Sequence, residues 1–323
     1  MNDPAHWAER PETATLRGIR LLVAMYRLGG VWLFRLCLAP VVLCYALFHR
    51  QARLASADYR RRLHRFDPTF PAPRPWHFIY HLWQFANALL DKLAVWMGDI
   101  TRYQVTLHGG ELIDDLLDRK QGAVILISHL GNFEICQALS ESRPRLRLTV
   151  LQHTLNAAKF NEVLAHHNRH SQVELLQVTD LDIGTAMHLS DKIGAGEFIA
   201  IAADRVAIGN GRSLERDFLG EPAPFPLGPF ALAIALEAPV LTIHSLKHNG
   251  RYHIHFKALW QGGTVPRKER TLQRNALADA FVTQLEQHCL SAPWQWYNFF
   301  PFWQSAARKL SPPPLTSRDD TDA

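Results

Sequence analysis

The chain has 323 residues, of which 47% are apolar, enough to fill the core of one large domain and to argue against a disordered chain. Its net charge of +5 and pI near 9.1 favour anionic partners, and the sign alone leaves nucleic acid, acidic lipid headgroups and an acidic carrier protein open. The four cysteines form no C-x-x-C pair, so we expect neither a disulfide framework nor a zinc site, and a reduced compartment fits best.

The first long apolar stretch is residues 31–48, VWLFRLCLAPVVLCYALF. As a helix it would be about 27 Å long, close to the thickness of a bilayer's hydrocarbon core, although it includes Arg35 and Pro40. More arginines follow this stretch than precede it, which predicts that its C-terminal side stays in the cytoplasm. We therefore predict an uncleaved anchor in the inner (cytoplasmic) membrane within an N-terminal region of residues 1–66. A buried helix of a soluble domain and a helix lying in the membrane interface remain open.

Two more helices are predicted before the first strand. Residues 52–65 form a basic helix whose charges by default face solvent, although beside an anchor they could hold anionic lipid. Residues 76–97 form an apolar, aromatic-rich helix that suits a domain resting on a membrane. The short strand 103–107 then starts the sheet.

Strands and helices alternate in the next part of the chain. The predicted strands are 123–127, 146–151, 174–177 and 197–202, and the helices between them begin at Asn132 or cover 156–167 and 183–193. This alternation predicts an α/β fold with a largely parallel central sheet flanked by helices, and with binding sites at the carboxyl ends of the strands. We place this domain at residues 67–306.

A histidine and a carboxylate follow the first of these strands. In the sequence Ser128-His129-Leu130-Gly131-Asn132-Phe133-Glu134, His129 ends the strand, Gly131 allows a turn and Asn132 can cap the next helix. The turn would let Glu134 reach back to the imidazole of His129, so that the other ring nitrogen could act as a base on a hydroxyl. The alternative is structural: a histidine that caps the strand and a glutamate that favours a helix N-terminus.

A second polar pair, Asp204 and Arg205, closes the strand 197–202. An arginine at this edge of the sheet is suited to hold a phosphate by bidentate hydrogen bonds, whether the phosphate belongs to a lipid headgroup or to a phosphopantetheine carrier. The alternative is an ion pair with Asp204 or with a surface acid.

The loop 218–230 is too rich in proline and glycine to be regular, and a helix follows at 231–236. Its Pro226-Leu227-Gly228-Pro229 turn brings backbone N–H groups close to a helix start, where they could bind an anion or shape a groove for an acyl chain.

The C-terminal part begins with strands 240–246 and 252–259, which are predicted as a hairpin at the sheet edge and precede an amphipathic helix at 271–290. Residues 293–303 hold seven aromatics, which fit either the core or a membrane interface. The tail, residues 307–323, is expected to be disordered.

Other motifs give no support for a metal, cofactor or nucleic-acid site. His166 and His170 lie one helical turn apart, but no glutamate follows the first histidine as it does in H-E-x-x-H. His253 and His255 lie on one strand face and are expected at the surface. Neither a dinucleotide fingerprint, a Walker motif nor a G-x-S-x-G elbow is present.

The segment from Ser128 to Glu134 resembles the H-x4-D/E block of the lysophospholipid acyltransferase superfamily, particularly the branch with the late acyltransferases of lipid A biosynthesis. The Arg205 block, the Pro226–Gly228 block and Ala238-Pro239-Val240 follow in the order of that superfamily. The segment Pro293–Phe299 also resembles the C-terminal P-x-Q-W-Y-N-F segment of the lipid A branch.

This resemblance implies a glycerolipid acyltransferase-like fold and transfer of a fatty acyl group from acyl carrier protein or coenzyme A to a hydroxyl of a lipid or glycolipid. His129 would then be the general base, Glu134 would orient it, and Arg205 would hold an acidic group of donor or acceptor. Backbone amides near Gly131 would stabilise the oxyanion. Two rivals stay open, an acyl thioester hydrolase and a lipid-binding protein without catalytic activity.

Overall fold

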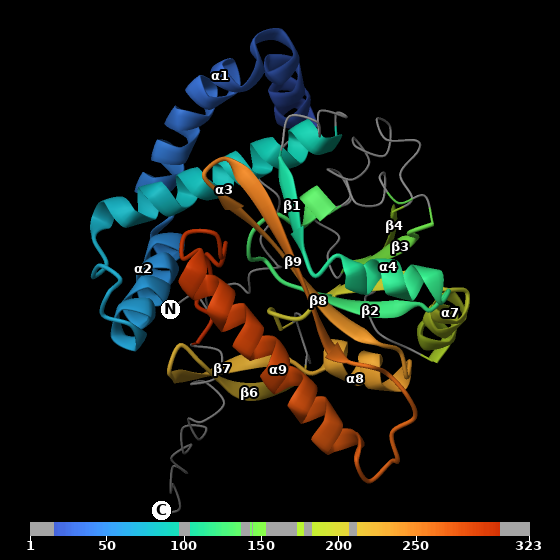
Figure 1. Cartoon of the computed structure of the whole chain (residues 1–323). Coiled ribbons are helices and arrows are strands. Elements are labelled where there is room, and N and C mark those ends of the chain that lie inside the picture. The colour runs from blue at the N-terminus through green and yellow to red at the C-terminus, as the bar shows by residue number, and fades with distance from the viewer. Residues whose placement is uncertain are drawn as a thin grey trace, which may run out of the picture.

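The computed structural model describes residues 16–96, 104–136, 143, 145–152, 173–177, 183–206 and 212–303. Its centre is a seven-stranded sheet in the order β1-β9-β8-β2-β5-β3-β4 (Figure 1). Every neighbouring pair is parallel except β8 and β9, so the predicted α/β class with a largely parallel sheet is confirmed. The strands of this sheet are β1 Val105–His108, β2 Ala123–Ile127, β3 Leu148–Gln152, β4 Val173–Gln177, β5 Phe198–Ala202, β8 Val240–His248 and β9 Arg251–Trp260.

Helices cover both faces of the sheet, and all five residues of β2 are buried. Val124 and Leu126 face the core shared with α2, α8 and α9, whereas Ile125 and Ile127 face the core shared with α4 and the 3-10 turn η2. Because both faces are covered, the strand is apolar throughout and does not alternate. These covering elements are α2 Arg50–Phe66, α4 Glu111–Asp118, η2 Phe133–Cys136, α7 Ile183–Gly194, α8 Gly228–Ala235 and α9 Arg270–Ser291.

The predicted hairpin of β8 and β9 is present, and it turns at Asn249 and Gly250, both of which have positive φ. Its predicted place at the sheet edge is wrong. Strand β1 pairs in parallel with the outer side of β9, with Val105 opposite Tyr252, and so becomes the edge strand itself. A parallel pairing between strands this distant in the chain has no local sequence signal.

The predicted proline-rich loop is also wrong in part, because much of it is regular. Strands β6, Ser213–Phe218, and β7, Glu221–Pro226, form a two-stranded antiparallel sheet. Pro222, Pro224 and Pro226 occupy every second position of β7, so all three can direct the side that lacks an amide donor away from β6. Helix α8 follows and confirms the predicted helix after this segment.

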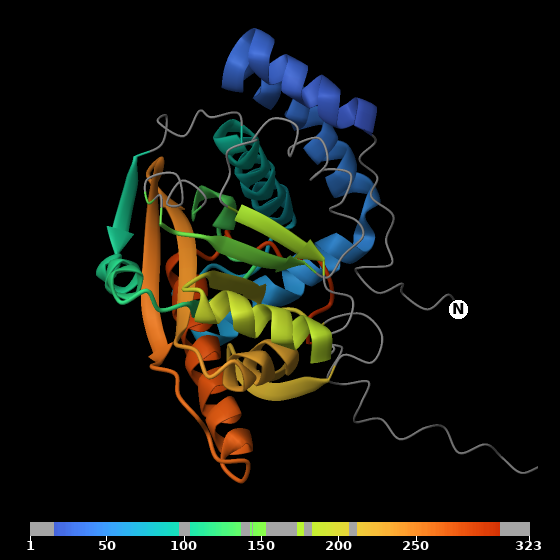
Figure 2. The same ribbon diagram turned by 90° about the vertical axis from the view of Figure 1, so that its right-hand side faces the viewer.

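Among the described residues before the sheet there are three helices: α1 Leu16–Phe48, α2, and α3 Pro75–Trp96. Helix α1 kinks at Gly30, and its part Tyr26–Phe48 is long and apolar enough to cross a membrane by length and composition. Figure 2 shows α1 at the outside of the molecule, with α3 between it and the sheet. The predicted boundary after residue 66 falls between α2 and α3, and α2 contributes Tyr59 and Leu63 to the main core.

Some predictions fall on residues outside the described ranges. These are the helix 156–167, which includes His166, then His170 just after it, and the tail 307–323. The helix predicted to begin at Asn132 is described only as far as η2, a single turn that ends at Cys136.

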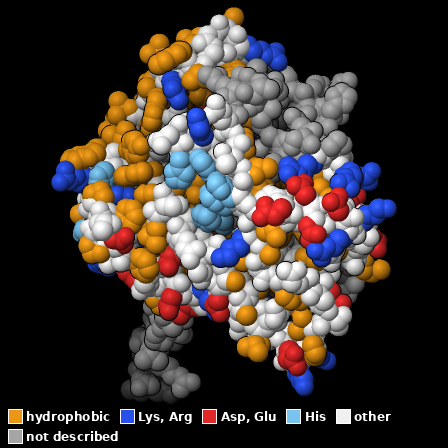
Figure 3. All heavy atoms as spheres, in the orientation of Figure 1, with side chains coloured by type: hydrophobic (Ala, Val, Ile, Leu, Met, Phe, Trp, Pro, Cys, Tyr) orange, Lys and Arg blue, Asp and Glu red, His pale blue; other side chains and the backbone are white. Residues whose placement is uncertain are grey.

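A cluster of histidines lies where β1, β9 and α9 meet, and part of it forms a patch at the surface (Figure 3). The rings of His108 and His255 stack with their centroids 4.5 Å apart, and His255 lies 4.9 Å from His288. Burial, and then the neighbouring His108, His253 and His248, lower the pKa of His255 to about 4. Burial, and then His255, Lys257 and His248, lower the pKa of His288 to about 4 as well.

This cluster is expected to make the fold sensitive to acid. Between the ordinary histidine pKa of 6.5 and about pH 4, His255 binds a proton in the unfolded chain but not in the folded one. The free energy of unfolding therefore decreases as the pH is lowered through this window. Because the ring is partly exposed, we expect a loss of about 1 kcal/mol from it. His255→Gln should flatten the pH dependence of the unfolding free energy, whereas His188→Gln, an exposed control on α7, should not. Equal slopes for wild type and His255→Gln would contradict this.

Candidate functional site

The site begins with the register between two parallel strands. Ile127 at the end of β2 lies opposite Ala202 at the end of β5, and the N–H of Ala203 donates to the carbonyl of Ile127 at 2.9 Å. His129 and Asp204 each follow two positions later. The pairing of β2 with β5 therefore brings an imidazole and a carboxylate to the same point at the carboxyl edge of the sheet.

His129 and Asp204 form a hydrogen-bonded dyad. The Nδ1 of His129 lies 2.8 Å from Oδ1 of Asp204, and the backbone N–H of His129 donates to Oδ2 at 2.9 Å. An ionised carboxylate can only accept hydrogen bonds, so Nδ1 carries the proton and Nε2 keeps its lone pair. The His129 side chain is 37% exposed and that of Asp204 is fully buried, so the base can be reached by substrate while its partner is shielded from water.

Burial and charge set the ionisation of the pair. Burial and the positive charge of Arg205 lower the pKa of His129, against the opposing effects of Asp204 and Glu134. Burial alone would raise the pKa of Asp204, but the hydrogen bonds and charges of His129 and Arg205 hold it well below its usual range. At neutral pH the dyad is thus a neutral imidazole beside a carboxylate, which is the state a general base needs.

The C-terminal aromatic segment closes the site from one side. Trp296 is fully buried, and its indole N–H donates to Oδ2 of Asp204 at 3.2 Å. The N–H of Tyr297 donates to the carbonyl of His129 at 3.1 Å, and the N–H of Gly131 donates to the carbonyl of Gln295 at 2.8 Å. Between the two alternatives for this segment, the structure places Trp296 in the core, where it fixes the carboxylate of the dyad.

Glu134, the predicted partner of His129, has a different partner in the structure. It lies on η2 and forms an ion pair with Lys92 of α3. Its charge still raises the pKa of His129, so the carboxylate remains close enough to act through space. The hydrogen bond that orients the imidazole is accepted by Asp204, which the sequence suggested only as part of the arginine block.

Two predictions for the turn after His129 need correction. The N–H of Gly131 is bonded to Gln295, and the N–H of Asn132 donates to the carbonyl of Ser245 at 2.9 Å, so neither amide is available to an oxyanion. The side chain of Asn132 does not cap a helix by accepting a bond; its Nδ2 donates to the carbonyl of Ala88 in α3 at 2.9 Å. Both residues instead hold the turn against β8, α3 and the C-terminal segment.

Arg205 lies beside the dyad, as predicted from its place after β5. Its Nη2 donates to the carbonyl of Tyr297 at 2.7 Å, and its guanidinium lies 5.3 Å from the ring centroid of Phe300. Burial lowers the pKa of Arg205 to about 10, so it keeps its positive charge at neutral pH. Arg205 is therefore a permanent positive charge, held in place at the edge of the site, as its proposed role in binding an anion requires.

Pro226 and Gly228 mark the junction between β7 and α8, and the intervening N–H of Leu227 donates to the carbonyl of Arg212 at 2.9 Å. Their role in binding an anion or an acyl chain stays a prediction. At the other end of the β6–β7 hairpin, the ring of Phe218 packs edge-on to Trp296 with centroids 5.2 Å apart, so this hairpin supports the wall behind Asp204.

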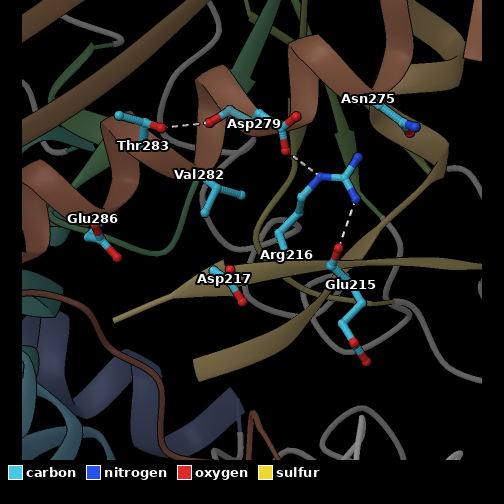
Figure 4. Close-up of a pocket in the computed structure, with 8 residues that line it drawn as sticks. All are labelled: Glu215, Arg216, Asp217, Asn275, Asp279, Val282, Thr283 and Glu286. Carbon is cyan, nitrogen blue, oxygen red and sulfur yellow. Dashed lines mark hydrogen bonds and ion pairs between the residues drawn. The ribbon is translucent and has the colours of Figure 1, made fainter. Parts of the chain in front are cut away.

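A hollow of about 500 Å³ lies elsewhere, between β6 and α9 (Figure 4). Its acidic side chains dominate the lining, and its one arginine, Arg216, is bound to Asp279 at 2.5 Å. Carboxylates would repel the phosphate groups of a lipid or a carrier, so this hollow does not suit the anionic substrates that Arg205 could hold.

The roles of three residues of the site were not predicted from the sequence. Asp204 is the partner of His129, Trp296 donates to Asp204, and Lys92 is the partner of Glu134. A sequence signal for the first is that the strands β2 and β5 are each followed two positions later by a polar residue, but their pairing is a property of the whole fold. The other two depend on contacts over more than forty residues of sequence and have no local signal.

Comparison with models of known protein families gives a match over most of the chain. The family model described as bacterial lipid A biosynthesis acyltransferase matches residues 27–305, a range that includes α3, the whole sheet, the dyad and the C-terminal aromatic segment. No curated protein matches the chain. The match covers most of the sequence and contains every residue of the candidate site, so this chain belongs to the bacterial lipid A biosynthesis acyltransferase family.

Proposed function

We propose that this lipid A-type acyltransferase moves a fatty acyl group from an acyl thioester, carried by acyl carrier protein or coenzyme A, to a hydroxyl of a lipid A-like or lysophospholipid-like acceptor. The observation that carries the proposal is the dyad of His129 and Asp204, in which Nε2 of a neutral, partly exposed imidazole is left to accept a proton. No metal or organic cofactor is needed for this reaction.

The chemistry assigns a step to each residue. Nε2 of His129 takes the proton of the acceptor hydroxyl as its oxygen attacks the thioester carbonyl, and Asp204 stabilises the imidazolium that forms. When the C–S bond breaks, the imidazolium returns the proton to the leaving thiolate, so the products are an ester and a free thiol. No acyl-enzyme is required.

The charges around the dyad suit anionic substrates. Arg205 would hold a phosphate or carboxylate of donor or acceptor near the base. Glu134 would add negative charge that favours the imidazolium, and its ion pair with Lys92 would hold it in place. Pro226 and Gly228 would contribute to the substrate groove from the β7–α8 junction.

We also propose a location. The apolar part of α1 and the arginines that follow it support a location at the inner membrane with the catalytic domain facing the cytoplasm, where acyl thioesters are available.

The test uses membranes that contain the full chain, thioesters of acyl carrier protein and of coenzyme A with labelled acyl groups, and mass analysis of the labelled lipid. We expect label in an ester of one lipid class, which identifies the acceptor, and none with a His129→Ala blank. Label released only as free fatty acid would favour the hydrolase. Transfer that is the same in the blank would contradict the site and favour a lipid-binding protein.

A further inference from the structure

After Gly30, helix α1 is apolar all round except for Arg35, yet its sides have different surroundings. After the kink at Gly30, the side with Phe34 and Val42 is buried, whereas the side with Trp32 and Leu36 is exposed. A helix that is apolar all round needs an apolar environment on every side. In the described chain only one side of α1 has such an environment.

The buried side packs along α3. Phe34 of α1 contacts a cluster with Leu90 of α3, and Val42 contacts a cluster with Leu82. The Nε of Arg35 also donates to Oδ1 of Asn87 in α3 at 2.9 Å. Crossing a bilayer away from the domain would remove these contacts and leave Arg35 in hydrocarbon without this partner.

Helix α3 is itself fastened to the catalytic domain by polar contacts. Its His81 is fully buried, with Nε2 3.0 Å from the carbonyl of Trp296. Asp91 accepts a hydrogen bond from Tyr252 of β9 at 2.6 Å, and Lys92 pairs with Glu134. Polar groups held in this way cannot move into a bilayer with α1, so α3 fixes α1 to the surface of the domain.

The exposed side of α1 is a continuous apolar stripe. On an ideal helix, the side chains of this stripe lie within about 60° of one another. Its exposed fractions are unusually high for apolar side chains, and Figure 3 shows hydrophobic side chains gathered over α1 and the neighbouring part of α3. The stripe consists of Trp32 (81% exposed), Leu36 (72%), Leu43 (50%) and Leu47 (61%).

The charge around this stripe matches an anionic surface. No aspartate or glutamate occurs between Leu16 and Ala57, while Arg27 and Arg50 are exposed near the two ends of the apolar stretch. Arginines beside an in-plane apolar face are attracted to acidic lipid headgroups. A face of this kind fits a phospholipid leaflet.

We infer that α1 does not cross the membrane but lies in the plane of one leaflet, with its stripe in the acyl chains and its other side on α3. The inference rests on the proposed function only in taking the acyltransferase to act at a membrane. The N-terminus and the catalytic domain are then on the same side of the bilayer.

This arrangement puts the leaflet next to the dyad. Ala88 of α3 accepts the hydrogen bond of Asn132 in the turn after His129, and the adjacent Leu89 is 42% exposed. A lipid acceptor can therefore reach His129 sideways from the leaflet, without leaving it.

The first arm of the test measures sidedness. The full chain carries a protease-sensitive tag at each end and is digested in sealed inverted vesicles and in spheroplasts. We expect both tags to be cut in the vesicles and neither in the spheroplasts. Tags cut from opposite sides of the membrane would show that α1 spans it and would overturn the inference.

The second arm measures binding through the stripe. The purified full chain is floated with vesicles of phosphatidylethanolamine and phosphatidylglycerol. For the double variant Trp32→Glu/Leu36→Glu we expect about ten-fold weaker partition or more, because two large apolar side chains are lost from the leaflet. The control Leu272→Glu, at a 73% exposed leucine of α9, should float like wild type.

Flotation of the double variant at the wild-type level would overturn the inference. It would also be overturned if the double variant bound vesicles normally but no longer self-associated, because the stripe would then be a contact between copies of the chain. Transfer to a detergent-solubilised acceptor is measured in parallel. If the double variant keeps this transfer, its binding defect is a loss of membrane contact and not of catalysis. If wild type shows no transfer, the proposed reaction is wrong, and the vesicle and protease results still decide how α1 lies in the membrane.

Discussion

Asp204→Asn is expected to lower kcat for acyl transfer about 10²–10⁴-fold with little change in KM for the thioester. Oδ2 of Asp204 accepts two hydrogen bonds, from the N–H of His129 and the indole of Trp296, so the amide oxygen of the variant should take that position. The amide NH₂ would then face Nδ1 of His129 as a donor. The imidazole would then have to carry its proton on Nε2, and Nε2 could no longer act as a base.

Glu134→Gln is the matched comparison, because it also replaces a carboxylate near His129 by an isosteric amide. Its partner is Lys92 and not the imidazole, so we expect a loss of about ten-fold, from weaker charge support of the imidazolium. His129→Ala gives the level at which no base is present. A smaller loss for Asp204→Asn than for Glu134→Gln would contradict the assignment of Asp204, and circular dichroism of each variant checks that it is folded.

The order of elements was predictable because it depends on local pattern. The continuous apolar run of β2 and its flanking turn signals predicted a buried strand, and the structure confirms one at Ala123–Ile127. The same holds for α7 and α9, whose predicted limits differ from those in the structure by one residue. These features depend on neighbours a few residues apart in the chain.

The partner of His129 was not predictable in the same way. The spacing of Glu134 suggested a local pair, but the 3-10 turn η2 carries this side chain to Lys92. Asp204 lies 75 residues away, and β3 and β4 precede it in the chain. It meets His129 only because β5 inserts between β2 and β3 in the sheet, and strand order is a property of the whole fold.

The aromatic C-terminal segment shows the same limit. Composition could not decide between a core and a membrane interface for residues 293–303, since both favour tryptophan and tyrosine. The decision comes from backbone pairing: Leu130 and Trp296 form an antiparallel bridge that draws the segment across the turn after His129. Burial of Trp296 follows from that bridge.

Gly131→Ala is expected to destabilise the fold by about 2–4 kcal/mol. Gly131 has φ +75°, which penalises any residue with a Cβ, and a Cβ there would lie 1.9 Å from the carbonyl oxygen of Ser245. The turn cannot move aside easily, because the N–H of Gly131 is bonded to Gln295 and that of Asn132 to Ser245. The expected strain would separate β8 from the turn and displace His129.

Gly250→Ala is the control that isolates the close contact. Gly250 has a similar φ of +80°, but a Cβ there would meet nothing within 4 Å, so only the backbone cost of about 1 kcal/mol should appear. Denaturant unfolding in detergent compares the two variants with wild type, and acyl transfer is measured at a temperature where all are folded. Equal losses of stability would show that Ser245 does not press on the turn; a larger loss for Gly131→Ala, accompanied by weaker transfer, would show that the backbone of β8 holds the base in position.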